Sequence, residues 1–313
     1  MREDKSAKDV HIESLTVTQE SKKKSAPAAT AKSKTFKITH PERVLYPKQK
    51  ITKMDVALYY KSVSPWLLPH TANRPLSLLR CHDTAGENCF FQKHLDIANY
   101  SSLFEASAKE QKINYLKNEA GLLDLVQMGV LELHTWQAHV DDTTHPDQII
   151  LDLDPDEKVS WSDLKKTAFR FKELLEKLDL KSTVKTTGGK GLHIHVSITP
   201  KYSWEQVKAF SKSLCMQLES EFPDLYITKS TKKKRTKKIY LDYLRNGFGA
   251  TAIAPYSLRA RTEPTVATPI TWEELQAAKT FIKFDIKTVL KRLATQNNDP
   301  WPKKLKQKLK IFA

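Results

Sequence analysis

A run of alternating strand-period and helix-period segments in the second half of the chain constrains the fold most strongly. Residues 148 to 154 are typical of a strand. Ser160 and Asp163 then form a capping pair that opens a helix with one apolar stripe. Residues 182 to 186 make a short second strand, and residues 191 to 198 alternate strictly between apolar and polar side chains, which predicts a third strand.

A second helix and a last strand complete this run. Ser203 and Gln206 form a capping box, and the helix that they open is followed by a strand over residues 238 to 244. The order β-α-β-β-α-β is typical of the ferredoxin-like and RNA-recognition folds, which have an antiparallel sheet with both helices on one face. We therefore predict an α/β (α+β) protein whose sheet has one face open for chemistry.

Composition and periodicity divide the chain into three parts. Residues 1 to 34 are polar and lack sustained apolar periodicity, so we expect a disordered tail. Residues 35 to 145 are expected to form a smaller N-terminal α/β module, and residues 146 to 313 a module with the β-α-β-β-α-β sheet and C-terminal helices. Residues 35 to 313 together are expected to form one domain.

Further elements are predicted outside the sheet. A helix is expected over residues 119 to 129, and residues 229 to 238 are rich in Lys and Arg, which favours a mobile basic loop. The segment from Trp301 to Lys310 is expected to be a solvated helical terminus. Two more pairs of capping residues open helices, Thr52 with Asp55 and Thr271 with Glu274.

The net charge of +16 indicates a polyanionic partner. The first 34 residues contain eight basic and five acidic side chains, so they supply only +3 of this charge. The rest of the chain carries the remainder, which makes nucleic acid the leading class of partner. A soluble, Lys-rich surface is the alternative explanation of the charge.

The chain has no stretch of 18 uninterrupted apolar residues and no export signal at its N-terminus. We therefore expect a cytoplasmic protein without membrane contacts. The three cysteines leave an odd number, which argues against a disulfide framework and fits a reducing compartment. Four side chains could in principle hold zinc, but they lack C-x2-C spacing and are better interpreted as loop and core residues: Cys81, His82, Cys89 and His94.

Two aspartates on the first strand of the sheet are candidate metal ligands. Asp152 and Asp154 are two residues apart, so their carboxylates project from the same face, about 7 Å apart along the chain. A divalent cation such as Mg²⁺ or Mn²⁺ would compensate both charges through oxygen ligands. The alternative is an ordinary D-x-D turn at a strand end.

Asp242 favours the metal interpretation, because it lies in the middle of the last predicted strand, where an uncompensated acid is unfavourable. In the β-α-β-β-α-β order the first strand lies centrally beside the third, and the last strand can approach them on the same sheet. Asp152, Asp154 and Asp242 could then converge, as two-metal nucleotidyl transfer requires.

The sequence from Thr186 to His193, Thr-Thr-Gly-Gly-Lys-Gly-Leu-His, leads into the third strand. Its glycines let the backbone approach an anion, while Thr187, Lys190 and His193 can donate to phosphate oxygens. It is not a P-loop, because the G-x-x-x-x-G-K-[ST] pattern is missing. An ordinary glycine-rich hairpin with surface histidines is the alternative.

A second class of function also fits this strand. The sequence from Lys190 to Val196 is similar to the RNP1 motif of RNA-recognition modules, which stack bases on exposed aromatic side chains. Here His193 and His195 take the exposed positions, and the aspartates would repel phosphate. Catalysis is therefore favoured over a non-catalytic, RRM-like nucleic-acid-binding module.

Taken together, Asp152-Leu-Asp154, Thr187-Gly-Gly-Lys-Gly-Leu-His193 and Asp242 resemble the three motifs of the archaeo-eukaryotic primase superfamily. More specifically, the chain resembles the polymerase domain of the prokaryotic end-joining enzyme ligase D. The resemblance covers most of residues 35 to 275 and implies a primase-polymerase fold. It includes the segments His40 to Pro47, Phe90 to His94 and Ala254 to Arg261.

The resemblance implies roles for individual residues. Asp152, Asp154 and Asp242 would hold two divalent ions, Mn²⁺ or Mg²⁺. Residues expected to contact the incoming nucleoside triphosphate are Thr187, Lys190, His193, Arg259, His134, Arg235 and Arg245. Residues expected to contact DNA are Phe90 and Phe91 at the template, Arg43 and Lys53 at the 5′-phosphate of the downstream strand, and Lys93.

Two departures from the family pattern affect nucleotide binding. Relatives often have Ser-Gly-Ser-Lys-Gly where this chain has Thr187-Gly-Gly-Lys-Gly, which keeps one hydroxyl and loses another. Arg245 stands where a Gln is frequent. The ribose preference is therefore left open.

The resemblance also implies a reaction and partners. The reaction is templated addition of NTP or dNTP to a 3′-hydroxyl at gaps and broken DNA ends in non-homologous end joining. The sequence Lys283-Phe-Asp-Ile lacks the Gly of the ligase motif K-x-D-G, so a separate ATP-dependent DNA ligase is expected, together with Ku. A cytoplasmic, nucleoid-associated location follows from this role.

Overall fold

The computed structural model describes residues 38–231, 235–296, 299–301 and 305–310. The predicted N-terminal tail and the centre of the predicted basic loop lie outside these ranges. None of the helices within them has the length and apolar character of a membrane-spanning segment.

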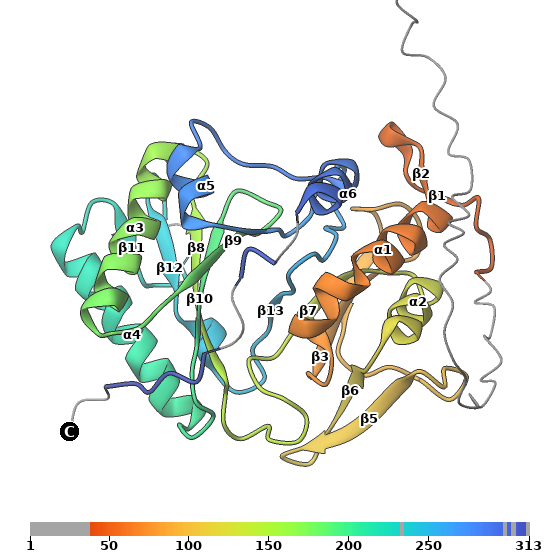
Figure 1. The fold of residues 1–313 in the computed structure, drawn as a ribbon, viewed down its shortest axis with the longest axis horizontal. Coiled ribbons are helices and arrows are strands. Elements are labelled where there is room, and N and C mark those ends of the chain that lie inside the picture. Colours follow the sequence, from red (N-terminus) through yellow and green to blue (C-terminus); the bar gives the residue numbers. More distant parts are fainter. Residues whose placement is uncertain (1–37, 232–234, 297–298, 302–304, 311–313) are drawn as a thin grey trace, which may run out of the picture. The chain divides into compact units, whose positions relative to one another are not determined.

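The predicted β-α-β-β-α-β run forms most of a six-stranded sheet in the order β11-β12-β8-β10-β9-β14 (Figure 1). β8 lies between β12 and β10 and is antiparallel to both, so the predicted strand order is confirmed. The elements around this sheet are β8 (Gln148–Pro155), α3 (Trp161–Lys177), β9 (Thr183–Thr186), β10 (Leu192–Ser197), α4 (Trp204–Glu221), β11 (Tyr226–Ile227), β12 (Ile239–Asp242), β14 (Pro269–Ile270) and α5 (Trp272–Ala277).

Both helices of the run begin at the predicted residues. The Ser160 hydroxyl accepts a hydrogen bond from the backbone N–H of Asp163, and Ser203 forms a capping box with Gln206. α3 and α4 pack on the apolar face of the sheet, as the fold prediction requires. Residues buried in that core include Leu151, Ile194, Phe171 and Leu214.

The opposite face of the sheet carries a row of ionisable side chains in register. Asp152 lies opposite Asp242 on one neighbouring strand and opposite His193 on the other, and His193 lies opposite Lys185. Residues directly opposite each other project to the same face, so these four side chains form one line across the sheet.

The prediction that this face is open is wrong for most of the row. Lys185, His193 and His195 are all buried. The ring of Trp301 lies 4.6 Å from that of His195 between centroids and covers this part of the sheet. Asp154, two residues beyond Asp152 near the end of β8, is exposed.

A second, four-stranded sheet has the order β13-β7-β3-β4, with helices α1 and α2 beside it (Figure 1). The predicted capping box of Thr52 and Asp55 begins α1, and the predicted second helix is α2. The elements in this half are β1 (Val44–Tyr46), β2 (Ile51–Thr52), α1 (Lys53–Thr71), β3 (Leu76–Cys81), β4 (Cys89–Gln92), β5 (Leu103–Ala108), β6 (Gln111–Leu116), α2 (Glu119–Gln127) and β7 (Val130–Thr135), joined from later in the chain by β13 (Ala252–Ile253) and α6 (Ile286–Thr295).

The chain after β12 returns to the N-terminal half. β13 pairs with β7, and Tyr256 and Leu258 join the same core as α1. α6, which the periodicity did not predict, adds Ile286 and Val289 to that core. Residues 252 to 289 therefore connect the two sheets, and residues from both sheets line one cavity.

The C-terminal segment is not the predicted helix. Trp301 and residues 305 to 310 contain no helical turn, and Gln307 pairs in parallel with Ile198. The Trp301 indole N–H donates to the carbonyl of Val184, and Leu309 is buried in the core of the six-stranded sheet. The prediction was wrong because Gln307 pairs with Ile198 and Leu309 packs into the core of the six-stranded sheet, whereas Leu305 remains exposed.

The expectation that the cysteines form no disulfide is also wrong. Cys81 and Cys89 lie opposite each other on β3 and β4 and form a disulfide, while Cys215 is a buried free thiol. An odd number of cysteines leaves one thiol free but does not prevent the others from pairing. The disulfide also removes Cys81 and Cys89 from the zinc ligand set that the sequence left open.

Candidate active site

The three candidate carboxylates lie near one another on β8 and β12, and each is paired with an arginine. Arg245, from the 3-10 turn that follows β12, places its Nε 3.1 Å from Asp152 Oδ2 and 3.2 Å from Asp242 Oδ2. Asp154 lies 3.4 Å from the Nη1 of Arg235. The antiparallel register of β8 and β12 therefore brings the predicted acids together.

The environment shifts the pKa values of these carboxyls in different directions. Burial alone would raise the pKa of Asp152, but His193 and Arg245 beside it lower the pKa below its ordinary value. Burial raises the pKa of Asp242, and burial together with repulsion from Asp152 raises the pKa of Asp154. Additional positive charge is thus favoured beside Asp154 and Asp242.

The glycine-rich loop between β9 and β10 needs its glycines. A Cβ on Gly191 would lie 2.6 Å from the carbonyl oxygen of Leu153. Gly188 has a φ of +68°, and a Cβ there would lie 2.7 Å from the Cγ of Arg259. The loop therefore lies directly against β8 and Arg259, which keeps Thr187 and Lys190 beside the aspartates.

A cavity of about 190 Å³ opens above this loop and the end of β8. Its polar lining, rich in cationic side chains, is suited to a polyphosphate. The predicted residues that it brings together are Asp152, Asp154, Thr187, Lys190, His193, Arg245, Arg259 and His134. Asp242 and Arg235 are not among the lining residues, but each forms an ion pair with a residue that is. Asp242 is paired with Arg245, and Arg235 with Asp154.

The RRM-like binding alternative does not fit the placement of the two histidines. His193 and His195 are 3% and 6% exposed, so neither ring is available to stack on a base. Burial, with Lys185 nearby, lowers the pKa of His193 to about 4, and His193 Nε2 lies 3.2 Å from Asp152. This histidine contacts a carboxylate in the cavity wall.

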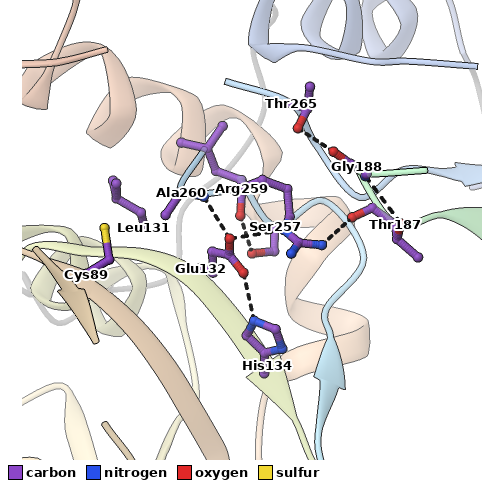
Figure 2. A network of polar contacts seen from close by, with 12 residues as sticks. Cys89, Leu131, Glu132, His134, Thr187, Gly188, Ser257, Arg259, Ala260 and Thr265 are labelled. Carbon is purple, nitrogen blue, oxygen red and sulfur yellow. Dashed lines mark hydrogen bonds and ion pairs between the residues drawn. The ribbon is translucent and has the colours of Figure 1, made fainter. Parts of the chain in front are cut away.

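Sequence reasoning missed two residues at the cavity. Glu132 is bonded to both His134 and Arg259, and Arg261 lines the cavity and packs over Gly189 (Figure 2 shows the Glu132 contacts). Glu132 could have been found from the alternation of β7, since it lies two residues before His134 and faces the same side.

The candidate template residues lie on the edge strand β4. Phe91 is 60% exposed, and its ring lies edge-on to that of His134 with centroids 5.2 Å apart. Phe90 stacks on His82 instead, and Lys93 is exposed just after the strand. β4 therefore extends an exposed aromatic side chain toward the rim of the cavity.

The candidate 5′-phosphate residues adjoin each other at the start of α1. The backbone N–H of Lys53 donates to the carbonyl of Arg43. Arg43 is exposed, whereas the Lys53 ammonium is buried and donates to the carbonyl oxygens of Thr39 and Gln127 and to the Gln127 side chain. Burial and the charge of Arg43 lower the pKa of Lys53.

Similarities to known proteins identify the family of the chain. A family profile described as "LigD, primase-polymerase domain" matches residues 52–301. The chain is 33% identical to the multifunctional non-homologous end joining protein LigD of Pseudomonas aeruginosa, over 96% of this chain and 37% of that protein. It is 35% identical to LigD of Mycolicibacterium smegmatis, over 76% of this chain and 32% of that protein.

The fold also matches a solved structure, the polymerase domain from Mycobacterium tuberculosis ligase D in complex with DNA. The TM-score is 0.78 at 30% identity, covering 84% of this chain and 95% of that one. The family profile and the fold thus define a nucleotidyltransferase of the primase-polymerase type. The chain belongs to the LigD primase-polymerase domain family, and it spans less than half the length of the two curated relatives named above.

Membership of this family implies a dependence on divalent metal ions. In the described ranges no three His, Cys, Asp or Glu side chains lie close enough together to hold one. However, one cationic nitrogen of Arg245 lies within 3.2 Å of two carboxylates, so Asp152 and Asp242 already share a position for positive charge. Carboxylate oxygens are the ligands that Mg²⁺ and Mn²⁺ prefer, so Asp152 and Asp242 have the chemistry to hold such an ion in place of the Arg245 guanidinium.

Proposed function

We propose that this chain is a DNA-end repair polymerase that adds nucleotides to a 3′-hydroxyl at gaps and double-strand breaks in non-homologous end joining. The observation that carries this proposal is the registered pair Asp152 and Asp242 beside a cavity lined by Lys190 and Arg259. Nucleotidyl transfer needs carboxylates at the reacting phosphate and cations along the triphosphate.

Asp152, Asp154 and Asp242 are the proposed catalytic carboxylates, and their role is to bind the metal ions. Two divalent ions, Mn²⁺ or Mg²⁺, would lower the pKa of the attacking hydroxyl and stabilise the charge that develops on the phosphate. The depressed pKa of Asp152 keeps that carboxylate ionised. Arg245 contacts both Asp152 and Asp242. It would limit the repulsion between these two carboxylates while no metal ion is bound.

The incoming nucleoside triphosphate, NTP or dNTP, is proposed to occupy the cavity. The Thr187 hydroxyl and the Lys190 ammonium lie on the glycine-rich loop, while Arg259 contacts that loop from the other side. His193, His134, Arg235 and Arg245 are the further proposed nucleotide contacts.

The DNA break is proposed to lie along β4 and the start of α1. Phe91 and Phe90 would stack on template bases, with Lys93 contacting the backbone. Arg43 would recognise a downstream 5′-phosphate, and the buried Lys53 would support the backbone around it. Ku and an ATP-dependent DNA ligase are the proposed partners, which implies a cytoplasmic location at the nucleoid.

Primer extension on gapped DNA tests this proposal. The substrate carries a one-nucleotide gap with or without a downstream 5′-phosphate, and each reaction contains Mn²⁺ or Mg²⁺ with NTP or dNTP. The expected result is templated addition that needs a divalent ion and is stimulated by the 5′-phosphate. DNA binding without any extension under all of these conditions would refute it and favour a binding module.

A further inference from the structure

Glu132 is a buried carboxylate with three donors around it (Figure 2). Its Oε1 accepts hydrogen bonds from the Nε of Arg259 at 3.0 Å and from the backbone N–H of Ala260 at 2.8 Å. Its Oε2 lies 2.9 Å from the Nε2 of His134. This single carboxylate therefore contacts two side chains that line the cavity and the backbone between β13 and β14.

The contact with Glu132 restricts how Arg259 can point. The guanidinium donates to Glu132 through Nε and to the carbonyl oxygen of Thr187 through Nη1, at 2.7 Å. Among the described residues, Nη2 has no hydrogen-bond acceptor, and Arg259 lines the cavity. Two fixed nitrogens on a planar group determine where the third one lies, so Glu132 and Thr187 together aim Nη2.

The contact also determines which nitrogen of His134 carries a proton. Burial opposes the ionisation of Glu132, but His134 and Arg259 outweigh it and lower the pKa to about 2. Burial lowers the pKa of His134, despite the opposing effect of Glu132. Near neutral pH an ionised carboxylate only accepts, so the neutral imidazole must hold its proton on Nε2. Its Nδ1 is then a hydrogen-bond acceptor.

The same network extends to the glycine-rich loop. Thr187 accepts from Arg259, and the carbonyl oxygen of Gly188 accepts from the Thr265 hydroxyl at 2.5 Å (Figure 2). The buried charge of Glu132 is compensated by Arg259, the cation that would bind phosphate.

We propose that Glu132 is a positioning residue for the nucleoside triphosphate: it aims Arg259 at the phosphates and fixes the Nε2–H tautomer of His134. The proposal rests on the proposed function of the cavity. Glu132 itself does not touch substrate. It belongs to β7 of the second sheet, so the sheet that contacts DNA would set the geometry of the nucleotide site on the other sheet.

Glu132→Gln tests the role by keeping the shape of the side chain and removing its charge. We expect the KM for the nucleotide in primer extension to rise about tenfold, because charge-assisted hydrogen bonds are lost, with kcat changed by less than about twofold. Glu132→Asp should recover part of the loss. The matched control is Glu274→Gln, which removes the charge of another arginine-bonded carboxylate at Arg292, outside the cavity, and should leave KM unchanged.

A double-variant comparison separates positioning from general destabilisation. If Glu132 acts through Arg259, Glu132→Gln combined with Arg259→Ala should raise KM by less than the product of the two single effects. Multiplicative effects, or an unchanged KM in Glu132→Gln, would overturn the proposal. A wild-type protein that neither binds triphosphate nor extends a primer would instead refute the proposed function.

A measurement on the unaltered protein covers the case in which Glu132→Gln fails to fold. Nitrogen-15 NMR of the histidine side chains at neutral pH should show His134, assigned with His134→Gln, as the neutral Nε2–H tautomer. An Nδ1–H tautomer, or a protonated His134, would contradict the role of Glu132 whether or not the enzyme is active.

Discussion

The acid cluster on the six-stranded sheet and the candidate DNA contacts in the N-terminal half differ in how deeply their side chains are buried. Asp152 and Asp242 are each 8% exposed, come from hydrogen-bonded strands and share one arginine. Phe91 and Arg43 are exposed and lie on an edge strand and a loop before α1. The proposed metal ligands are thus buried and paired across strands, whereas the proposed DNA contacts are exposed to solvent.

This difference has consequences for substitutions. Removing a buried charge also changes the environment of the charges that it contacts. The effects of such substitutions on activity should therefore be large, and those of paired residues should not be additive. An exposed contact should affect one feature of the substrate and leave stability unchanged. The predictions below test this contrast, from the largest expected effect to the smallest.

Asp242→Ala should reduce primer extension by at least about 10³-fold, as expected when a group that acts in the transition state is removed. DNA affinity, measured by fluorescence anisotropy, should stay within about twofold of wild type. The matched control is Asp156→Ala, which removes a partly exposed carboxylate that accepts from backbone N–H groups just beyond β8. An active Asp242→Ala enzyme would refute the assignment of the acid cluster.

Phe91→Ala should weaken binding to gapped DNA about tenfold, because one base loses its aromatic stacking partner. The melting temperature should not change, since the ring is mostly exposed. Phe104→Ala removes another surface ring, which stacks on Tyr115 in the β5-β6 hairpin, and should leave DNA binding intact. Equal losses in both variants would mean that β4 is not the template surface.

Arg245→Gln should raise the affinity of the apoprotein for Mn²⁺ about fivefold, because the side chain that neutralises Asp152 and Asp242 is removed. Isothermal titration with the metal alone measures this effect. Lys166→Gln, an exposed residue on α3, removes the same charge at a distance and is the control. Weaker Mn²⁺ binding in Arg245→Gln would show that the arginine supports the metal site instead of competing with it.

Arg43→Ala should lower the preference for a 5′-phosphorylated gap about threefold, the effect of one exposed phosphate contact. Lys53→Ala should instead lower stability by about 2 kcal/mol, because its buried ammonium makes three hydrogen bonds. Extension assays on both gap types and thermal denaturation distinguish the two roles. If Lys53→Ala keeps its stability and loses discrimination, both residues bind the phosphate directly.

Much of the fold could be predicted from local patterns. Capping residues such as Thr52, Ser160 and Ser203 identified helix starts, because a side-chain oxygen that satisfies free N–H groups is a local requirement. The alternation in β10 identified a strand with two different faces. The C-terminal segment and α6 were not predicted correctly, since their structure depends on packing against strands and helices far away in the sequence.

By itself the sequence determined the strand order and the three aspartates, because periodicity and the β-α-β-β-α-β run leave few topologies that bring these acids together. The tertiary structure decided how the rest of the site is built. The contact of Arg245 with Asp152, the packing of Trp301 over His195 and the attachment of Glu132 to Arg259 all join residues that are far apart in the chain. Such contacts depend on how elements pack in three dimensions, which no local pattern encodes.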